Sequence, residues 1–152
     1  MSLPKIAVTM GDPAGVGPEV CLHLLQDEEI ARLCTPVVFG DAAVLDQAAV
    51  QCRLAKPDKV VAGLGEADAP SVFDIGAIGL RDFETGTANA ATGRAGYTYV
   101  ENAIDAALGG QVAAVTTAPL NKEALHAAGI SFPGHTEIFA ARTHAQCSCM
   151  LQ

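Results

Sequence analysis

Charge is scarce in this chain: Asp, Glu, Lys and Arg make up 17% of its 152 residues, while hydrophobic residues make up 50%. Tryptophan is absent, and aromatic residues amount to 5%. Disorder requires low hydrophobicity together with high charge, so this composition excludes a disordered chain. The length is sufficient for one domain with its own core. The high apolar content favours a surface that is covered, either in a dimer or by further polypeptide.

Signals for membranes and for nucleic acid are also missing. No apolar run approaches the roughly 20 residues that a membrane-spanning helix needs. The first five residues lead directly into a strand-like segment without a hydrophobic signal region, which predicts a cytoplasmic protein. Lys and Arg number 9 against 17 acidic residues, and the net charge of −8 argues against a nucleic-acid partner. A phosphorylated small molecule stays compatible, because backbone N–H groups can bind phosphate.

Spacings typical of metal ligands are missing as well. The number of cysteines is odd, their spacing fits no zinc finger, and we expect buried, reduced thiols. These cysteines are Cys21, Cys34, Cys52, Cys147 and Cys149. No three spaced His, Asp or Glu ligands are visible, so the chain alone predicts no metal site. His23, His126 and His144 are interpreted as structural or solvated.

Short apolar runs alternate with helical patterns along the chain. Strands are predicted at residues 6–10, 36–39 and 112–117, all buried, with shorter β segments at 59–61 and 71–73. Helices are predicted at residues 18–25, 42–54, 97–108, 121–128 and 136–143. This alternation predicts an α/β protein with a largely parallel sheet flanked by helices. No internal repeat or interdomain linker interrupts residues 1–152.

A glycine-rich loop at residues 11–17 joins the first predicted strand to the first helix. A loop in this position is a natural site for an anion or a cofactor. It is not a Rossmann fingerprint, because Val20 occupies the third glycine position, and it lacks the lysine of a Walker loop. A tight turn without a ligand is the alternative. The candidate site residues here are Gly11, Asp12, Gly15 and Gly17.

A second candidate segment, residues 116–122, follows a predicted parallel strand. Ligands of α/β sheets bind at the carboxyl ends of the strands. Asn121 can cap the next helix, and Lys122 then lies at the start of that helix. A cation is unfavourable there, which indicates an anionic partner. A solvated lysine is the alternative.

The third candidate is the sequence Gly-His-Thr-Glu at residues 134–137. Pro133 and Gly134 predict a rigid turn, which places His135 and Thr136 at the entry of the last helix. Histidine can donate or accept hydrogen bonds, transfer protons or bind metal. A capping or surface histidine is the alternative for His135.

Three segments together resemble 4-hydroxythreonine-4-phosphate dehydrogenase, the PdxA family of vitamin B6 biosynthesis. They are residues 11–19 (GDPAGVGPE), 117–125 (TAPLNKEAL) and 128–137 (AGISFPGHTE). The resemblance covers essentially the whole chain but only about the first half of the family's length. It implies the fold of the isocitrate and isopropylmalate dehydrogenases, present here in incomplete form. We therefore expect residues 1–152 to be the N-terminal portion of a longer enzyme.

The resemblance implies an NAD(P)-dependent oxidation of 4-phosphooxy-L-threonine that needs a divalent metal, usually zinc, and ends in decarboxylation. The family's substrate-binding pair falls on His135 and Thr136. Its three metal-binding histidines lie downstream of this motif and are not in the sequence. The resemblance also implies a homodimer with the active site between subunits. Two alternatives stay open: a dehydrogenase of four-carbon sugar-acid phosphates such as threonate or erythronate phosphate, and a non-catalytic phosphate-binding module.

Overall fold

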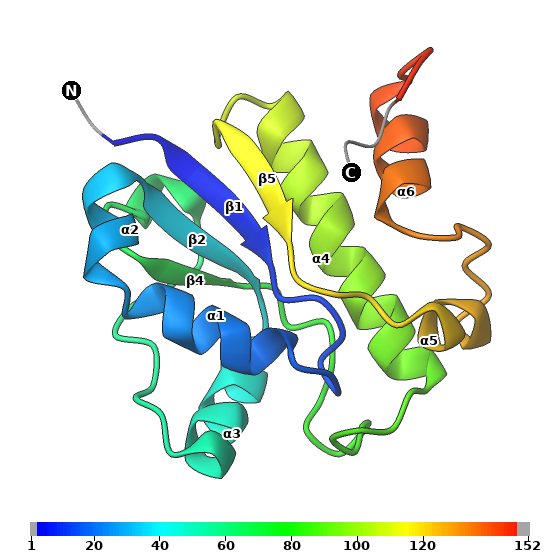
Figure 1. Cartoon of the computed structure of the whole chain (residues 1–152), viewed down its shortest axis with the longest axis horizontal. Helices are drawn as coiled ribbons and strands as arrows, with labels where there is room; N and C mark the ends of the chain where they lie inside the picture. The colour runs from blue at the N-terminus through cyan, green and yellow to red at the C-terminus, as the bar shows by residue number, and fades with distance from the viewer. Residues whose placement is uncertain (1–2, 149–152) are drawn as a thin grey trace.

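A computed structural model describes residues 3–148 (Figure 1). The strands are β1 (Lys5–Thr9), β2 (Thr35–Gly40), β3 (Val60–Val61), β4 (Ser71–Asp74) and β5 (Ala114–Thr117). The helices are α1 (Gly17–Leu25), α2 (Glu28–Leu33), α3 (Ala42–Cys52), α4 (Ala90–Leu108), α5 (Lys122–Ala127) and α6 (His135–Thr143), with a 3-10 turn η1 (Leu64–Glu66). The predicted α/β class is confirmed.

The five strands form one parallel sheet in the order β3-β4-β2-β1-β5. Strand β1 lies between β2 and β5, so that Ala7 pairs with Val37 on one side and with Val115 on the other. Because all strands are parallel, their carboxyl ends meet at one edge of the sheet. The loop after β1 and the segment after β5 therefore start side by side.

Helices cover both faces of the sheet (Figure 1). On one face, Val8, Val38 and Val72 pack with residues of α1 and α3. On the other face, Ala7 and Val37 pack with residues of α4 and η1. The strands thus have apolar side chains on both faces, as is typical of parallel sheets.

Two helices differ from the prediction. Helix α4 begins at Ala90 rather than at Tyr97, because the Asn89 side chain accepts from the Thr92 N–H and the Thr92 hydroxyl accepts from the Asn89 N–H. This reciprocal cap starts the helix inside a segment rich in small polar residues. Helix α2 was not predicted, although the Asp27 side chain caps it by accepting from two backbone N–H groups.

Strand β5 is an edge strand, so the prediction that residues 112–117 are buried was wrong. Ala114 and Thr116 are exposed, and only Val112, which precedes the strand, is buried. The thiol prediction was also wrong in part. Cys21 is buried, whereas Cys34 is half-buried and Cys52 and Cys147 are exposed; all four are free thiols. Cys149 lies outside the described residues.

Helix α6 packs on α4 rather than on the sheet. Its Ile138 is fully buried in a cluster with Val100 and Ile104 of α4. Arg142 adds ion pairs with the same helix. Between residues 3 and 148, no helix combines the length and the hydropathy of a membrane span.

Candidate functional site

The carboxyl ends of β1 and β5 bring two of the predicted segments into contact. The Asp12 backbone N–H donates to the Pro119 carbonyl at 3.0 Å. A Cβ atom added to Gly11 would lie 2.4 Å from that same carbonyl oxygen, so only glycine allows this approach. Gly11 also has a φ of +75°, which favours glycine. Residues 11–17 and 117–120 therefore form one unit at this edge of the sheet.

Most of the glycine loop is covered by the protein's own backbone. A Cβ atom on Gly17 would lie 1.9 Å from the Met10 carbonyl oxygen, and Gly17 is buried. Gly15 is exposed. Close packing therefore accounts for Gly11 and Gly17 without a ligand, and Gly15 is the loop glycine that faces solvent.

Asp12 is 5% exposed, and its Oδ1 accepts a hydrogen bond from the Ala14 N–H at 2.8 Å. Burial raises the pKa of this carboxyl group, while hydrogen bonds from Ala14 and Thr92 oppose the rise. The side chain fixes the turn after β1 and links it to the start of α4. Asp12 is therefore a buried side chain that stabilises the loop conformation.

His135 is half-buried at the first position of α6, and its Nε2 atom is buried without a hydrogen-bond partner. Burial lowers the pKa of the imidazole below its ordinary value of 6.5, and the neighbouring Ala118 backbone opposes this shift. His135 therefore lies beside the segment that contacts the glycine loop. An unpaired buried polar atom costs about 1–3 kcal/mol, which makes it a candidate for ligand binding.

The amino-terminal end of α6 adds further donors beside His135. The first N–H groups of a helix have no partner within the helix and carry partial positive charge. Thr136 is half-buried in this first turn and adds a hydroxyl group. This combination of imidazole, hydroxyl and backbone N–H groups suits the oxygen atoms of a phosphate or a carboxylate.

The Asn121 side chain is engaged in a helix cap, whereas the Lys122 side chain is exposed to solvent. The Asn121 Oδ1 accepts from the Glu123 and Ala124 N–H groups at 2.9 and 3.1 Å, so the predicted cap of α5 is confirmed. Capping occupies the side-chain oxygen that a ligand would otherwise contact. Lys122 is exposed at the first position of α5. Among the described residues it enters no ion pair, so its role in anion binding stays a prediction.

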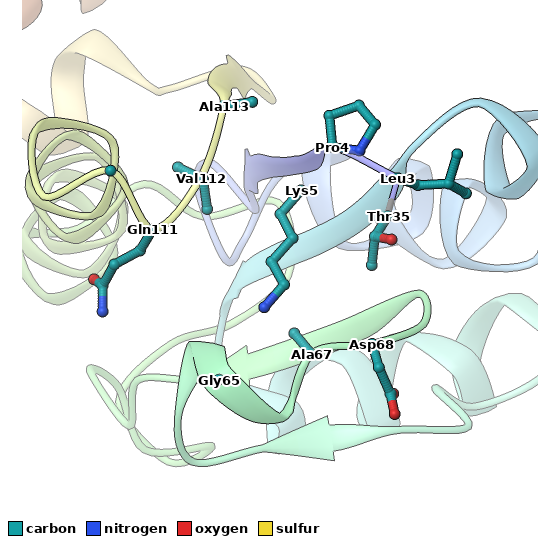
Figure 2. Close-up of a pocket in the computed structure, with 11 residues that line it drawn as sticks. Leu3, Pro4, Lys5, Thr35, Gly65, Ala67, Asp68, Gln111, Val112 and Ala113 are labelled. Carbon is teal, nitrogen blue, oxygen red and sulfur yellow. The ribbon is translucent and has the colours of Figure 1, made fainter. Parts of the chain in front are cut away.

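A separate cavity of about 610 Å³ opens at the opposite edge of the sheet, at the amino ends of β1 and β2 (Figure 2). Sequence reasoning did not find it. Figure 2 shows Lys5 extending across it between η1 and the loop before β5. The Lys5 Nζ atom already donates to the Leu64 carbonyl at 2.6 Å, and the nearby Asp68 carboxylate is ion-paired with Lys59. None of the predicted site residues line this cavity.

The described residues do not fit a catalytic zinc ion. Over residues 3–148, no group of three or more His, Cys, Asp or Glu side chains is arranged to hold a metal. His23, His126 and His144 are all exposed. Any metal chemistry therefore requires ligands other than those that these residues supply.

Comparison with known proteins agrees with the sequence resemblance. Residues 32–152 match the family described as pyridoxal phosphate biosynthetic protein PdxA. The chain belongs to the PdxA family. A Trichlorobacter lovleyi 4-hydroxythreonine-4-phosphate dehydrogenase is 39% identical over 90% of this chain and 42% of its own length. A Symbiobacterium thermophilum PdxA relative, provisionally named D-threonate 4-phosphate dehydrogenase, is 39% identical over 92% of the chain and 43% of its own.

Solved structures of PdxA proteins share this fold. The 4-hydroxythreonine-4-phosphate dehydrogenase of Burkholderia phymatum superposes with a TM-score of 0.85 at 38% identity, covering 95% of this chain and 44% of that one. A terephthalate 1,2-cis-dihydrodiol dehydrogenase of Burkholderia xenovorans gives 0.67 at 32% identity, covering 86% and 38%. The chain thus spans less than half the length of the relatives it matches.

Proposed function

We propose that this chain is the substrate-binding portion of a PdxA-type dehydrogenase that acts on 4-phosphooxy-L-threonine. In that reaction the secondary alcohol is oxidised to a ketone, and the resulting β-keto acid loses CO2. Membership of the PdxA family and the relative from Trichlorobacter lovleyi support this assignment. His135 and Thr136 are proposed to bind the phosphate or hydroxyl groups of the substrate.

The observation that carries the proposal is the unpaired, buried Nε2 atom of His135. Burial lowers the pKa of the imidazole and so favours its neutral form, which can take part in hydrogen bonding without bringing in a full charge. A ligand reaches Nε2 only after the imidazole rotates, because the atom is covered. Pairing it with a substrate oxygen would remove the cost of an unsatisfied polar group.

We also propose that the enzyme uses NAD(P) and a divalent metal as cofactors. NAD(P) would accept the hydride, and a divalent metal, with zinc favoured, would polarise the alcohol oxygen. Residues 3–148 lack a set of three metal ligands, so they would not hold this metal by themselves. What residues 3–148 contribute is binding and orientation of the phosphorylated end of the substrate.

Two alternatives each have one supporting observation. The Symbiobacterium thermophilum relative favours a four-carbon sugar-acid phosphate, D-threonate 4-phosphate, as the substrate. The absence of a metal-ligand cluster over residues 3–148 favours a phosphate-binding module without catalysis. Binding measurements with both phosphorylated compounds separate the first alternative. The second predicts no redox activity even when any coding sequence beyond codon 152 is expressed together with this chain, whereas the dehydrogenase predicts activity of such a longer protein.

The test is calorimetric titration of the 152-residue chain with 4-phosphooxy-L-threonine and, separately, with D-threonate 4-phosphate. We expect His135→Ala to weaken binding roughly 10- to 150-fold, which corresponds to one hydrogen bond of about 1.5–3 kcal/mol to a charged group. His23→Ala is the control, because His23 is an exposed histidine within helix α1. Equal affinity of the wild type and His135→Ala would contradict the assignment.

A cytoplasmic homodimer is also part of the proposal. Exposed apolar side chains support it: Leu108 at the end of α4 is 63% exposed, and it lines an apolar groove with Val115 of β5 and Phe139 of α6. Light scattering at micromolar concentration should give twice the mass of one chain. A stable monomer under these conditions would contradict the dimer.

A further inference from the structure

Helix α6 is attached to α4 by an arginine that reaches two carboxylates. The Nη1 atom of Arg142 lies 3.1 Å from Oε1 of Glu101, and its Nη2 atom lies 2.6 Å from Oδ1 of Asp105. Glu101 and Asp105 are four residues apart and therefore neighbours on one face of α4. The planar guanidinium presents its donors in a fixed fork, so bridging the two carboxylates restricts the direction of approach as well as the distance.

Arg142 lies on the same face of α6 as His135. The positions 135, 138 and 142 follow the i, i+3, i+7 spacing of one helix face. Between them, Ile138 is fully buried against Val100 and Ile104 of α4. Ile138 and Arg142 therefore fix both the rotation of α6 and its position along α4. The placement of His135 at the beginning of the helix follows from these two contacts.

We propose that Arg142 is a positioning residue: by holding α6 to Glu101 and Asp105, it keeps His135 beside Ala118 at the carboxyl edge of the sheet. The proposal rests on the function proposed above for His135. Arg142 lies about two helical turns from His135. It would affect substrate binding only through the position of His135, not by touching the substrate.

Arginine suits this geometry better than lysine does. Lysine has one compact ammonium group and cannot bridge two carboxylates with a rigid fork. The pairs are partly exposed, with 35% of the Arg142 side chain accessible to solvent. Partly exposed pairs contribute little to global stability. The effect of Arg142 should therefore appear in the environment of His135 and in ligand affinity, rather than in the melting temperature.

The first test measures the pKa of the His135 imidazole by NMR titration of the 152-residue chain in about 0.15 M salt, where the screening length is roughly 8 Å. Arg142→Gln should raise this pKa toward 6.5, because a loosened α6 exposes the imidazole to water. The double variant Glu101→Gln/Asp105→Asn should also raise the pKa of His135.

A direct charge effect on His135 predicts opposite shifts in the two variants. Removing the positive charge of Arg142 would raise the pKa, whereas removing the negative charges of Glu101 and Asp105 would lower it. Opposite shifts, or none, would overturn the proposal.

The second test measures affinity for 4-phosphooxy-L-threonine by calorimetry. Arg142→Gln should weaken binding roughly 10-fold or more, since small misplacements of a binding group are costly, and Arg142→Lys should give an intermediate loss. The control is Arg32→Gln, which removes an exposed pair with Glu28 on α2 and should change nothing. Unchanged affinity in Arg142→Gln would overturn the proposal. If the wild type itself does not bind, the proposed function fails, and the pKa measurement still decides the role of Arg142.

Discussion

Tyr99 and Asp41 are joined by a buried hydrogen bond: the phenol of Tyr99 donates to Oδ2 of Asp41 at 2.9 Å. Asp41 follows β2 and is 2% exposed, and its carboxylate also accepts from the Ala77 and Ile78 N–H groups. One carboxylate thus connects the end of a central strand, the loop after β4 and helix α4. Burial and the neighbouring Asp41 both raise the pKa of the Tyr99 phenol.

Replacing Tyr99 by Phe should lower the free energy of unfolding by about 1.5–3 kcal/mol, the usual contribution of a hydrogen bond to a charged group. The buried carboxylate would keep its two backbone donors and lose the third. Urea unfolding measures the change. Tyr97→Phe is the matched control on the same helix, because Tyr97 is half-buried, and a loss of at most about 0.5 kcal/mol is expected there. Equal losses in the two variants would contradict a special role for the Tyr99 hydroxyl.

Gly93→Ala should destabilise the protein even though alanine normally favours a helix interior by about 1 kcal/mol. The added Cβ would lie 2.0 Å from the Ala124 carbonyl oxygen, where α4 and α5 approach each other closely. The helices must separate, at a cost of about 1–3 kcal/mol. Gly65→Ala is the control, since a Cβ there meets nothing within 4 Å. A stabilised Gly93→Ala variant in thermal unfolding would show that this contact is not tight.

Stability should depend on pH through His135. Its pKa is depressed in the folded state, so the unfolded chain binds more protons between the folded value and about 6.5. The contribution of the neutral imidazole is complete above pH 6.5 and is lost as the pH falls below it. His135→Gln should therefore reduce the loss of unfolding free energy between pH 7.5 and 5.5. An identical pH dependence in the wild type and the variant would show that His135 is not desolvated.

The 152-residue chain should not reduce NAD at a measurable rate. Residues 3–148 contain no group of three metal ligands, and the glycine loop departs from the Rossmann pattern at Val20. The assay contains zinc, NAD and 4-phosphooxy-L-threonine, with the full-length Trichlorobacter lovleyi enzyme as the positive control. Zinc-dependent formation of NADH by the short chain would reveal a complete site within it.

Periodicity predicted most of the fold because apolar spacing responds directly to burial. The starts of β1, α3 and α6 fall within about one residue of the predicted positions. The start of α4 was missed because a reciprocal cap by Asn89 and Thr92, rather than apolar spacing, begins that helix. The edge position of β5 could not be predicted, since a short apolar run does not reveal how many neighbours a strand has.

The candidate site was predicted in part. Sequence reasoning placed His135 at the entry of α6, and the structure confirms that position. It did not show that Gly11 is a glycine because the backbone of Pro119, more than 100 positions later, approaches it closely. It also did not show that Gly17 folds back against the Met10 carbonyl, since the path of the loop is not visible in its composition. The ion pairs of Arg142 were missed for the same reason: Glu101 and Asp105 are distant in sequence, and no local pattern joins them to α6.

The order of the strands has a consequence for synthesis on the ribosome. Strand β1 is made first, yet one of its two neighbours, β5, is made last: Thr9 pairs with Thr117, 108 positions later. Since synthesis proceeds at about 5–20 residues per second, β5 is completed on the order of 5–20 s after β1. During that interval one edge of a buried, apolar strand is open to other chains. Chaperones that bind extended apolar segments should therefore engage the nascent chain through residues 5–9 until β5 emerges.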